Sequence, residues 1–183
     1  MKPKAILIFG PAGSGKTSTA KRIGENKNWT HISEDEYWGE IKKGRPTGEY
    51  RTHEEQKIIW QRVLRDIKNE FSKNNNIALE FLVYEDPPKP LLFYKKELLK
   101  LGTEILIRIL KPKPEVISGR RKERNLPHDR TYFDRKKTGA ECKDHLQIEV
   151  LDSKHIKKEW IIEDSEFSLE DIYKNYFSEF VEK

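Results

Sequence analysis

The sequence predicts an α/β fold with three layers, in which a central parallel sheet of five strands has helices on both faces. Short apolar segments alternate along the chain with longer segments whose apolar residues recur at helical spacing. Strands and helices that alternate in this way are joined by right-handed crossovers, which place helices on either side of a parallel sheet. A glycine-rich loop follows the first apolar segment, and 183 residues suit a single domain.

The first half of the chain predicts two strands and three helices. The apolar, β-branched segment Lys4–Phe9 predicts a buried strand, and residues 18–23 after the glycine-rich loop are compatible with a helix. A short second strand is expected at Thr30–Ser33. Thr52 with Glu55 three residues later forms a capping box, which begins a long helix. Between the second strand and this helix, a shorter helix has three large residues on one side: Tyr37, Trp38 and Ile41.

The second half continues the alternation. Ile77–Tyr84 predicts the third strand and Glu104–Leu110 the fourth. Trp160–Ile162 predicts a short fifth strand, after which Ser168 caps the last helix. A helix between the third and fourth strands has an apolar face at helical spacing, made of Leu91, Tyr94, Leu98 and Leu101.

Composition limits the class of protein. Hydrophobic residues make up only 35% of the chain and charged residues 37%, but the apolar residues fall in periodic segments, which predicts a soluble globular protein. The early apolar run Ala5–Phe9 is too short for a signal-peptide core or a membrane span. The single cysteine, Cys142, cannot form an internal disulfide, so a reduced cytoplasmic setting is the simplest interpretation. The oligomeric state is left open.

Positive charge gathers in one segment. The net charge is +5, and residues 111–137 alone hold ten Lys or Arg against four Asp or Glu. Such a segment can hold phosphates or nucleic acid, and it can equally be a solvated surface. Charge alone therefore names no partner.

The loop after the first strand contains the most specific motif. Gly10-x-x-x-x-Gly15-Lys16-Thr17 matches the P-loop pattern and lies between a predicted strand and a predicted helix. Glycines allow several backbone N–H groups to point at phosphate oxygens, and the helix adds its positive N-terminal end. We expect Lys16 to hold the β and γ phosphates of ATP and Thr17 to bind Mg²⁺. The expected nucleotide contacts are Gly10, Pro11, Ala12, Gly13, Ser14, Gly15, Lys16, Thr17 and Ser18.

Two carboxylates are candidates for the reaction. Asp35 follows the second strand, where it could accept a proton from an attacking hydroxyl, or it could be a helix cap or a solvated acid. Its neighbours Glu34 and Glu36 are expected on the surface. Glu80 interrupts an apolar run, where a buried charge is costly. It could orient Mg²⁺ through water or assist Asp35, unless that strand has one solvated face.

The arginines in the first half of the basic segment, residues 111–137, are candidates for binding phosphate. Arg120 and Arg124 share a helical face, and a mobile segment that closes over the site with them would stabilise charge in a phosphoryl-transfer transition state. Arg121 is expected to contact the nucleotide as well. Arg130 and Arg135 are weaker candidates, because a solvated basic loop explains them nearly as well.

A P-loop occurs in kinases, GTPases, motors and helicases, and here the Asn-Lys-x-Asp guanine motif is absent. The chain resembles the small P-loop kinases of the nucleoside-monophosphate-kinase type, which include shikimate and gluconate kinases, zeta-like toxins and polynucleotide 5′-kinases. The resemblance spans nearly the whole chain and rests on the residues Gly10–Thr17, Asp35, Arg120, Arg124 and 161–170.

The resemblance implies one P-loop kinase domain over residues 1–183. Its core would be 1–35, 75–117 and 146–183, with a substrate-binding helical segment at about 36–74 and a basic lid at about 118–145. The loop within residues 161–170 borders the adenine in that group, which implies Ser165 as a further nucleotide contact.

Ser33–Tyr37 is most similar to the polynucleotide-kinase segment that presents the general base, which again implies Asp35. Those enzymes have an arginine three residues later, where this chain has Trp38. The leading hypothesis is an ATP- and Mg²⁺-dependent kinase acting on a hydroxyl of a nucleoside, a nucleotide or a polynucleotide 5′ end. A kinase of a small metabolite and a non-kinase ATP-dependent switch or binding module are the alternatives. The expected partners are ATP and a hydroxyl-bearing acceptor, with nucleic acid as one candidate and no membrane.

Overall fold

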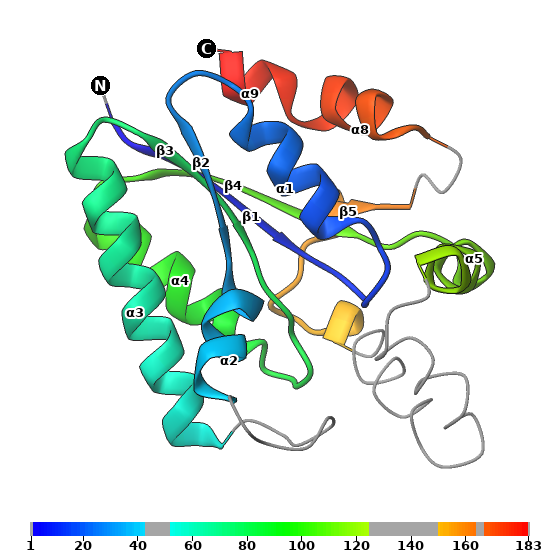
Figure 1. Ribbon diagram of the computed structural model, residues 1–183, viewed down its shortest axis with the longest axis horizontal. Coiled ribbons are helices and arrows are strands. Elements are labelled where there is room, and N and C mark those ends of the chain that lie inside the picture. Colours follow the sequence, from blue (N-terminus) through cyan, green and yellow to red (C-terminus); the bar gives the residue numbers. More distant parts are fainter. Residues whose placement is uncertain (1, 43–51, 125–149, 164–166, 183) are drawn as a thin grey trace.

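The computed structural model describes residues 2–42, 52–124, 150–163 and 167–182. Its centre is a five-stranded sheet in the order β2-β3-β1-β4-β5, and every pair of neighbours is parallel (Figure 1). The carboxyl ends of all strands therefore meet at one edge. The strands are β1 (Lys4–Phe9), β2 (Trp29–Ser33), β3 (Asn76–Glu80), β4 (Glu104–Leu110) and β5 (Ile161–Ile162).

Helices cover both faces of the sheet, which confirms the predicted three-layer α/β fold (Figure 1). One face packs against α3 (His53–Ser72) and α4 (Lys89–Lys100). The other packs against α1 (Lys16–Gly24), α8 (Leu169–Tyr176) and α9 (Ser178–Glu182). The alternation of β1 explains this arrangement, because Ala5, Leu7 and Phe9 lie in the first core and Ile6 and Ile8 in the second.

Two further helices lie near the edge where the strands end. α2 (Glu34–Ile41) follows β2 without a loop, and α5 (Pro114–Arg124) follows β4. Figure 1 shows α5 beside the loop that joins β1 to α1. This edge therefore brings together the P-loop, the start of α2 and the arginines of α5.

The capping box predicted at the start of the long helix is present. Thr52 Oγ1 accepts a hydrogen bond from the backbone N–H of Glu55 at 3.2 Å, and the Glu55 carboxylate accepts one from the N–H of Thr52 at 2.8 Å. A cap of this kind stabilises a helix by about 1 kcal/mol. It fixes where α3 begins, and Ile59, Val63 and Ile67 then face the core at intervals of four residues.

Three local predictions were wrong. β3 ends at Glu80 and not at Tyr84, because its neighbours turn away there: Glu80 pairs with Ile8 near the end of β1 and with Ser33 at the end of β2. The single last helix is two, since the backbone leaves helical geometry at Phe177. Glu34, expected on the surface, is fully buried, whereas Glu36 is exposed.

Within the described ranges, no helix has both the length and the apolar character needed to cross a membrane.

Candidate functional site

The backbone of the P-loop has the shape that its glycines permit. Gly10 has φ +150°, and a Cβ atom there would lie 2.2 Å from the carbonyl oxygen of Leu110 on β4, so no other residue fits. Gly15 has φ +100°, a left-handed value, and serves as the N-cap of α1. The loop therefore passes close to the sheet and delivers the N-terminus of α1 to its edge, where backbone N–H groups favour an anion.

Lys16, the first residue of α1, is folded back over the loop. Its Nζ donates hydrogen bonds to the carbonyl oxygens of Gly10 (3.0 Å) and Pro11 (2.9 Å), and the residue is only 7% exposed. Burial lowers the pKa of Lys16 to about 8, although the charges of Asp35 and Glu80 act in the opposite direction. A phosphate placed beside the ammonium group would therefore stabilise its charged form.

This pKa predicts how nucleotide affinity depends on pH. The protonated ammonium binds phosphate and the neutral amine does not, so the affinity for Mg·ATP should be highest below pH 8 and fall as the pH rises through about 8. Above that value the loss approaches about tenfold for each pH unit. Calorimetric titration with Mg·ATP between about pH 7 and about pH 9.5 measures it. Lys16→Met is the control, and its weak residual binding should not change over this range; a wild-type affinity that is equally flat would contradict the assignment.

Thr17 and Glu80 are joined at the edge of the sheet. The hydroxyl of Thr17 donates a hydrogen bond to Glu80 Oε2 at 2.8 Å, and Glu80 Oε1 lies 3.0 Å from Nε2 of His31 on β2. Glu80 is 4% exposed. Burial opposes its charge, but the hydrogen bonds from His31 and Thr17 and the charge of Lys16 hold its pKa below the ordinary value. Glu80 is thus an ionised carboxylate held directly beside the P-loop hydroxyl.

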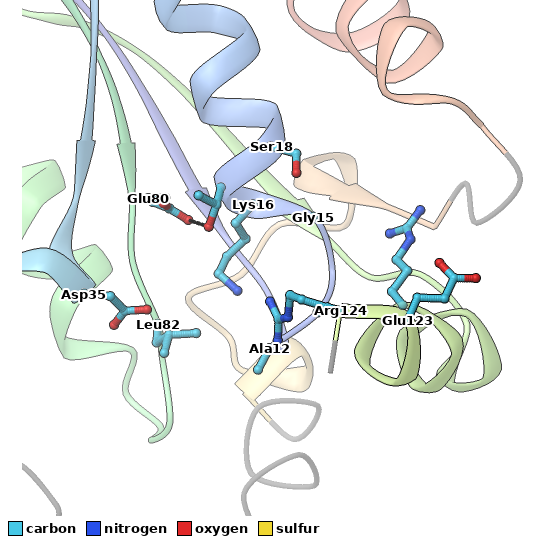
Figure 2. Close-up of a pocket in the computed structure, with 12 residues that line it drawn as sticks. Ala12, Gly15, Lys16, Ser18, Asp35, Glu80, Leu82, Glu123 and Arg124 are labelled. Atoms are coloured by element: carbon cyan, nitrogen blue, oxygen red, sulfur yellow. Dashed lines mark hydrogen bonds between the residues drawn. The ribbon is translucent and has the colours of Figure 1, made fainter. Parts of the chain in front are cut away.

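A cavity of about 530 Å³ opens in front of the loop. Figure 2 shows Asp35 and Leu82 on one side of Lys16, and Arg124 from α5 on the other. The cavity is lined by Ala12, Gly13, Gly15, Lys16, Thr17, Ser18, Asp35, Glu80, Leu82, Arg120, Glu123 and Arg124. A single pocket therefore contains the P-loop, three carboxylates (Asp35, Glu80 and Glu123) and two arginines.

α5 is fastened to the P-loop by two arginines. Nη1 of Arg120 donates to the carbonyl oxygen of Ser14 at 3.2 Å. Arg121 is 3% exposed and donates from Nε (3.0 Å) and Nη2 (2.7 Å) to the carbonyl oxygen of Ala12. The nucleotide contact expected of Arg121 stays a prediction; its side chain is buried against the loop and is not among the residues that line the cavity.

The other predicted site residues divide into three groups. Both predicted carboxylates and both predicted transition-state arginines line the cavity. Gly10, Pro11 and Ser14 belong to the loop but do not line it. Ser165 lies outside the described residues, as do Arg130 and Arg135.

Three residues at or beside the site did not follow from the sequence. His31 contacts Glu80 only because β2 and β3 are neighbours in the sheet, a pairing that no local pattern gives. Leu82 lines the cavity because β3 ends two residues before it. For Glu123 a signal was available, since it lies three residues after Arg120 on the same helical face.

Comparison with protein families gives one match. The model of a family described as an AAA domain matches residues 6–141, most of the chain and all of the cavity-lining residues. No curated protein matches the chain by sequence.

Solved structures with the same fold have low sequence identity to the chain. An APS kinase from Mycobacterium tuberculosis, solved with AMPPNP and APS, has a TM-score of 0.62 at 10% identity, covering 100% of this chain and 99% of that chain. A tunicamycin resistance protein from Deinococcus radiodurans has a TM-score of 0.63 at 13% identity, covering 97% and 95%. A sugar kinase from Janibacter has a TM-score of 0.59 at 12% identity, covering 94% and 91%. At these identities the likeness concerns the fold alone.

Proposed function

Because the chain belongs to the AAA domain family and has the fold of the P-loop kinases, we propose that it transfers the γ-phosphate of ATP to a hydroxyl group. The acceptor would be a nucleoside, a nucleotide or the 5′ end of a polynucleotide. The observation that supports a transferase over a plain nucleotide-binding module is the position of Asp35. Its carboxylate lies on the wall of the same cavity as Lys16 and Thr17.

The reaction that this arrangement supports is an in-line displacement at phosphorus. The acceptor oxygen forms a bond to the γ-phosphorus of ATP while the bond from that phosphorus to the β–γ bridging oxygen breaks, which releases ADP. Asp35 takes the proton of the attacking hydroxyl. Lys16, Arg120 and Arg124 stabilise negative charge on the phosphoryl oxygens. These three cations and Asp35 all line the cavity.

The oxygen donors beside the P-loop fit a magnesium ion. The Thr17 hydroxyl and the Glu80 carboxylate are 2.8 Å apart and both reach the cavity. No group of three or more His, Cys, Asp or Glu side chains in the described part of the chain could hold a metal. Mg²⁺ commonly uses only one or two protein ligands, together with water and substrate phosphates. Thr17 would bind the ion directly and Glu80 directly or through water; the ion would neutralise charge on the β and γ phosphates.

The role of Glu80 leads to a prediction for Glu80→Gln. Loss of the carboxylate charge should raise the Mg²⁺ concentration needed for half-maximal nucleotide binding by about 10-fold to about 100-fold, the usual effect of losing a partner around a metal. Calorimetry with ATP measures this in a Mg²⁺ series. Binding of ATP in excess EDTA is the control, because it should change little. Equal Mg²⁺ requirements in the variant and the wild type would remove Glu80 from the metal site.

The acceptor class is proposed from the start of α2. Ser33–Tyr37 is similar to the segment that presents the base in polynucleotide kinases, and Asp35 within it lines the cavity. We further propose that residues 36–74, which include α2 and α3, bind the acceptor, and that residues 118–145 form a lid. Arg120 and Arg124 lie in the described part of that lid and face the cavity.

A screen with γ-labelled ATP tests the proposal. The protein is incubated with Mg²⁺ and panels of nucleosides, nucleotides, 5′-hydroxyl oligonucleotides and sugars, and labelled products are separated. A labelled nucleoside, nucleotide or oligonucleotide 5′ end is the expected result. A product only among sugars or other small metabolites would identify a metabolite kinase. ATP binding without any product would favour the ATP-dependent switch.

A further inference from the structure

Glu34 is a buried acid that the proposed reaction does not use. It is the first residue of α2 and directly precedes Asp35. Its exposed fraction is 0%, whereas Asp35 is exposed at the cavity. Successive residues of a helix point in directions about 100° apart, so one acid of this pair faces the interior while the other faces the P-loop.

The Glu34 carboxylate connects three helices. Oε1 accepts a hydrogen bond from Nε2 of Gln56, in the first turn of α3, at 2.9 Å. Oε2 accepts one from the hydroxyl of Tyr94, in the middle of α4, also at 2.9 Å. Tyr94 is itself fully buried, and its ring packs against Phe81 and Phe93 at centroid distances of 5.3 and 5.4 Å. Tyr94 is thus held by the core, and Tyr94 and Gln56 together hold the Glu34 carboxylate.

Burying this carboxylate opposes folding. A charge removed from water is costly even when it is hydrogen-bonded, and apolar residues of similar volume at such positions are often more stabilising. Sequences that break the rule of an apolar core tend to do so at functional sites. The functional group closest to Glu34 in the chain is Asp35, the proposed base.

Other contacts between α2 and α3 lie further along the helix. The Tyr37 hydroxyl donates to Asp66 Oδ2 at 2.9 Å, and Arg62 contacts Glu40 at 3.4 Å in an exposed pair. Exposed pairs of this kind hold a geometry weakly. Glu34 lies at the end of α2 that presents Asp35, and its side chain is fully buried.

We propose that Glu34 is a positioning residue, which fixes the first turn of α2 so that Asp35 faces the P-loop. This inference rests on the proposed function, because it takes Asp35 as the base. Gln56 and Tyr94 then hold Glu34 in place through their hydrogen bonds to its carboxylate. The consequence is that α3 and α4, which do not line the described cavity, determine the geometry of proton transfer.

Two substitutions of Glu34 separate position from charge. Glu34→Ala removes the acceptor of both hydrogen bonds. Glu34→Gln keeps the shape, and both partners can adapt to it, because a tyrosine hydroxyl can also accept and the Gln56 amide can turn. We expect Glu34→Ala to lower kcat for phosphate transfer by about 10²-fold, the effect of a small misplacement of a reacting group. KM for ATP and the Kd of Mg·ATP should stay at the wild-type values, and Glu34→Gln should recover most of the rate.

A matched pair of tyrosine variants controls for stability. Tyr94→Phe removes one of the two donors to Glu34. Tyr173→Phe removes the hydroxyl of another buried tyrosine, on the opposite face of the sheet, which donates to Asn26 at 3.0 Å. Both should lower the melting temperature, but only Tyr94→Phe should lower kcat. The same loss of kcat in both variants would overturn the proposal, and so would a wild-type kcat in Glu34→Ala. Tyr94→Phe also serves as the test if Glu34→Ala does not fold.

Amide hydrogen exchange separates failure of this inference from failure of the proposed function. In Glu34→Ala, the amides of α2 should exchange faster while those of α1 keep their protection; unchanged exchange in α2 would overturn the proposal. This readout and Mg·ATP binding need no acceptor. If the wild type phosphorylates nothing in the acceptor screen, the proposed function fails. The link between Glu34 and proton transfer by Asp35 then fails together with the proposed function. Amide hydrogen exchange still decides whether Glu34 holds the first turn of α2.

Discussion

Lys16→Met should abolish phosphate transfer and greatly weaken ATP binding. Lys16 is the cation at the centre of the cavity, and its ammonium group lies within hydrogen-bonding distance of two P-loop carbonyls. Removing it takes away the charge that the β and γ phosphates would meet, in a site that Arg120 and Arg124 also line. Losing one preorganised donor from such a site lowers kcat by about 10²-fold to about 10³-fold.

Stability should respond in the opposite direction. Burial lowers the pKa of Lys16 to about 8, so its charged form is disfavoured in the folded protein, and methionine relieves that penalty. We expect an equal or higher melting temperature for Lys16→Met. Calorimetric titration, thermal unfolding and the labelled-ATP assay measure the three effects. Lys21→Met is the control, because Lys21 is an exposed residue of the same helix and should leave all three unchanged. A Lys16 variant that still binds Mg·ATP with wild-type affinity would overturn the assignment of the loop.

Asp35→Asn should abolish transfer while ATP binding is preserved. The amide has the size of the carboxylate but cannot take the proton of the attacking hydroxyl, and a positioned general base contributes about 10²-fold to about 10⁴-fold. Asp35 is exposed at the cavity, so the melting temperature should not change. Single-turnover transfer from γ-labelled ATP to the identified acceptor, together with the Kd of Mg·ATP, measures both parts.

The neighbouring acid supplies the control for Asp35. Glu36 is exposed and does not line the cavity, so Glu36→Gln should transfer at the wild-type rate. If Asp35→Asn kept normal turnover with the true acceptor, the base would have to be another group. Glu80 would be the next candidate, because it also lines the cavity and lies directly beside Thr17 of the P-loop.

The sequence predicted most of the fold because its strongest signals are local. Lys4–Phe9 and Glu104–Leu110 have the predicted boundaries, since apolar residues that fill a parallel strand also mark its ends. The capping box of Thr52 likewise depends on residues close together in the chain. The resemblance to the P-loop kinases is confirmed, and it depended on motifs of the same local kind.

Features that arise from the pairing of distant elements could not be predicted. The side of the chain to which Glu34 points depends on where α3 and α4 pack, and nothing near Ser33–Tyr37 indicates Gln56 or Tyr94. The end of β3 depends on where two other strands turn away. Glu34 and Asp35 are therefore adjacent acids of which one is buried and the other exposed, although in the sequence both are simply polar residues.

Arg120 and Arg121, which connect α5 to the P-loop, also polarise two peptide groups of that loop. Arg121 binds the Ala12 carbonyl and Arg120 the Ser14 carbonyl. Each of these oxygens belongs to a peptide unit whose other end is an N–H, that of Gly13 in the first case and of Gly15 in the second, and both glycines line the cavity. Amide resonance couples the two ends, so a cation on the oxygen withdraws electron density from the nitrogen and makes its hydrogen a stronger donor. Arg121 does not line the cavity, but it would act on a phosphate bound there through the polarised peptide group of Ala12 and Gly13.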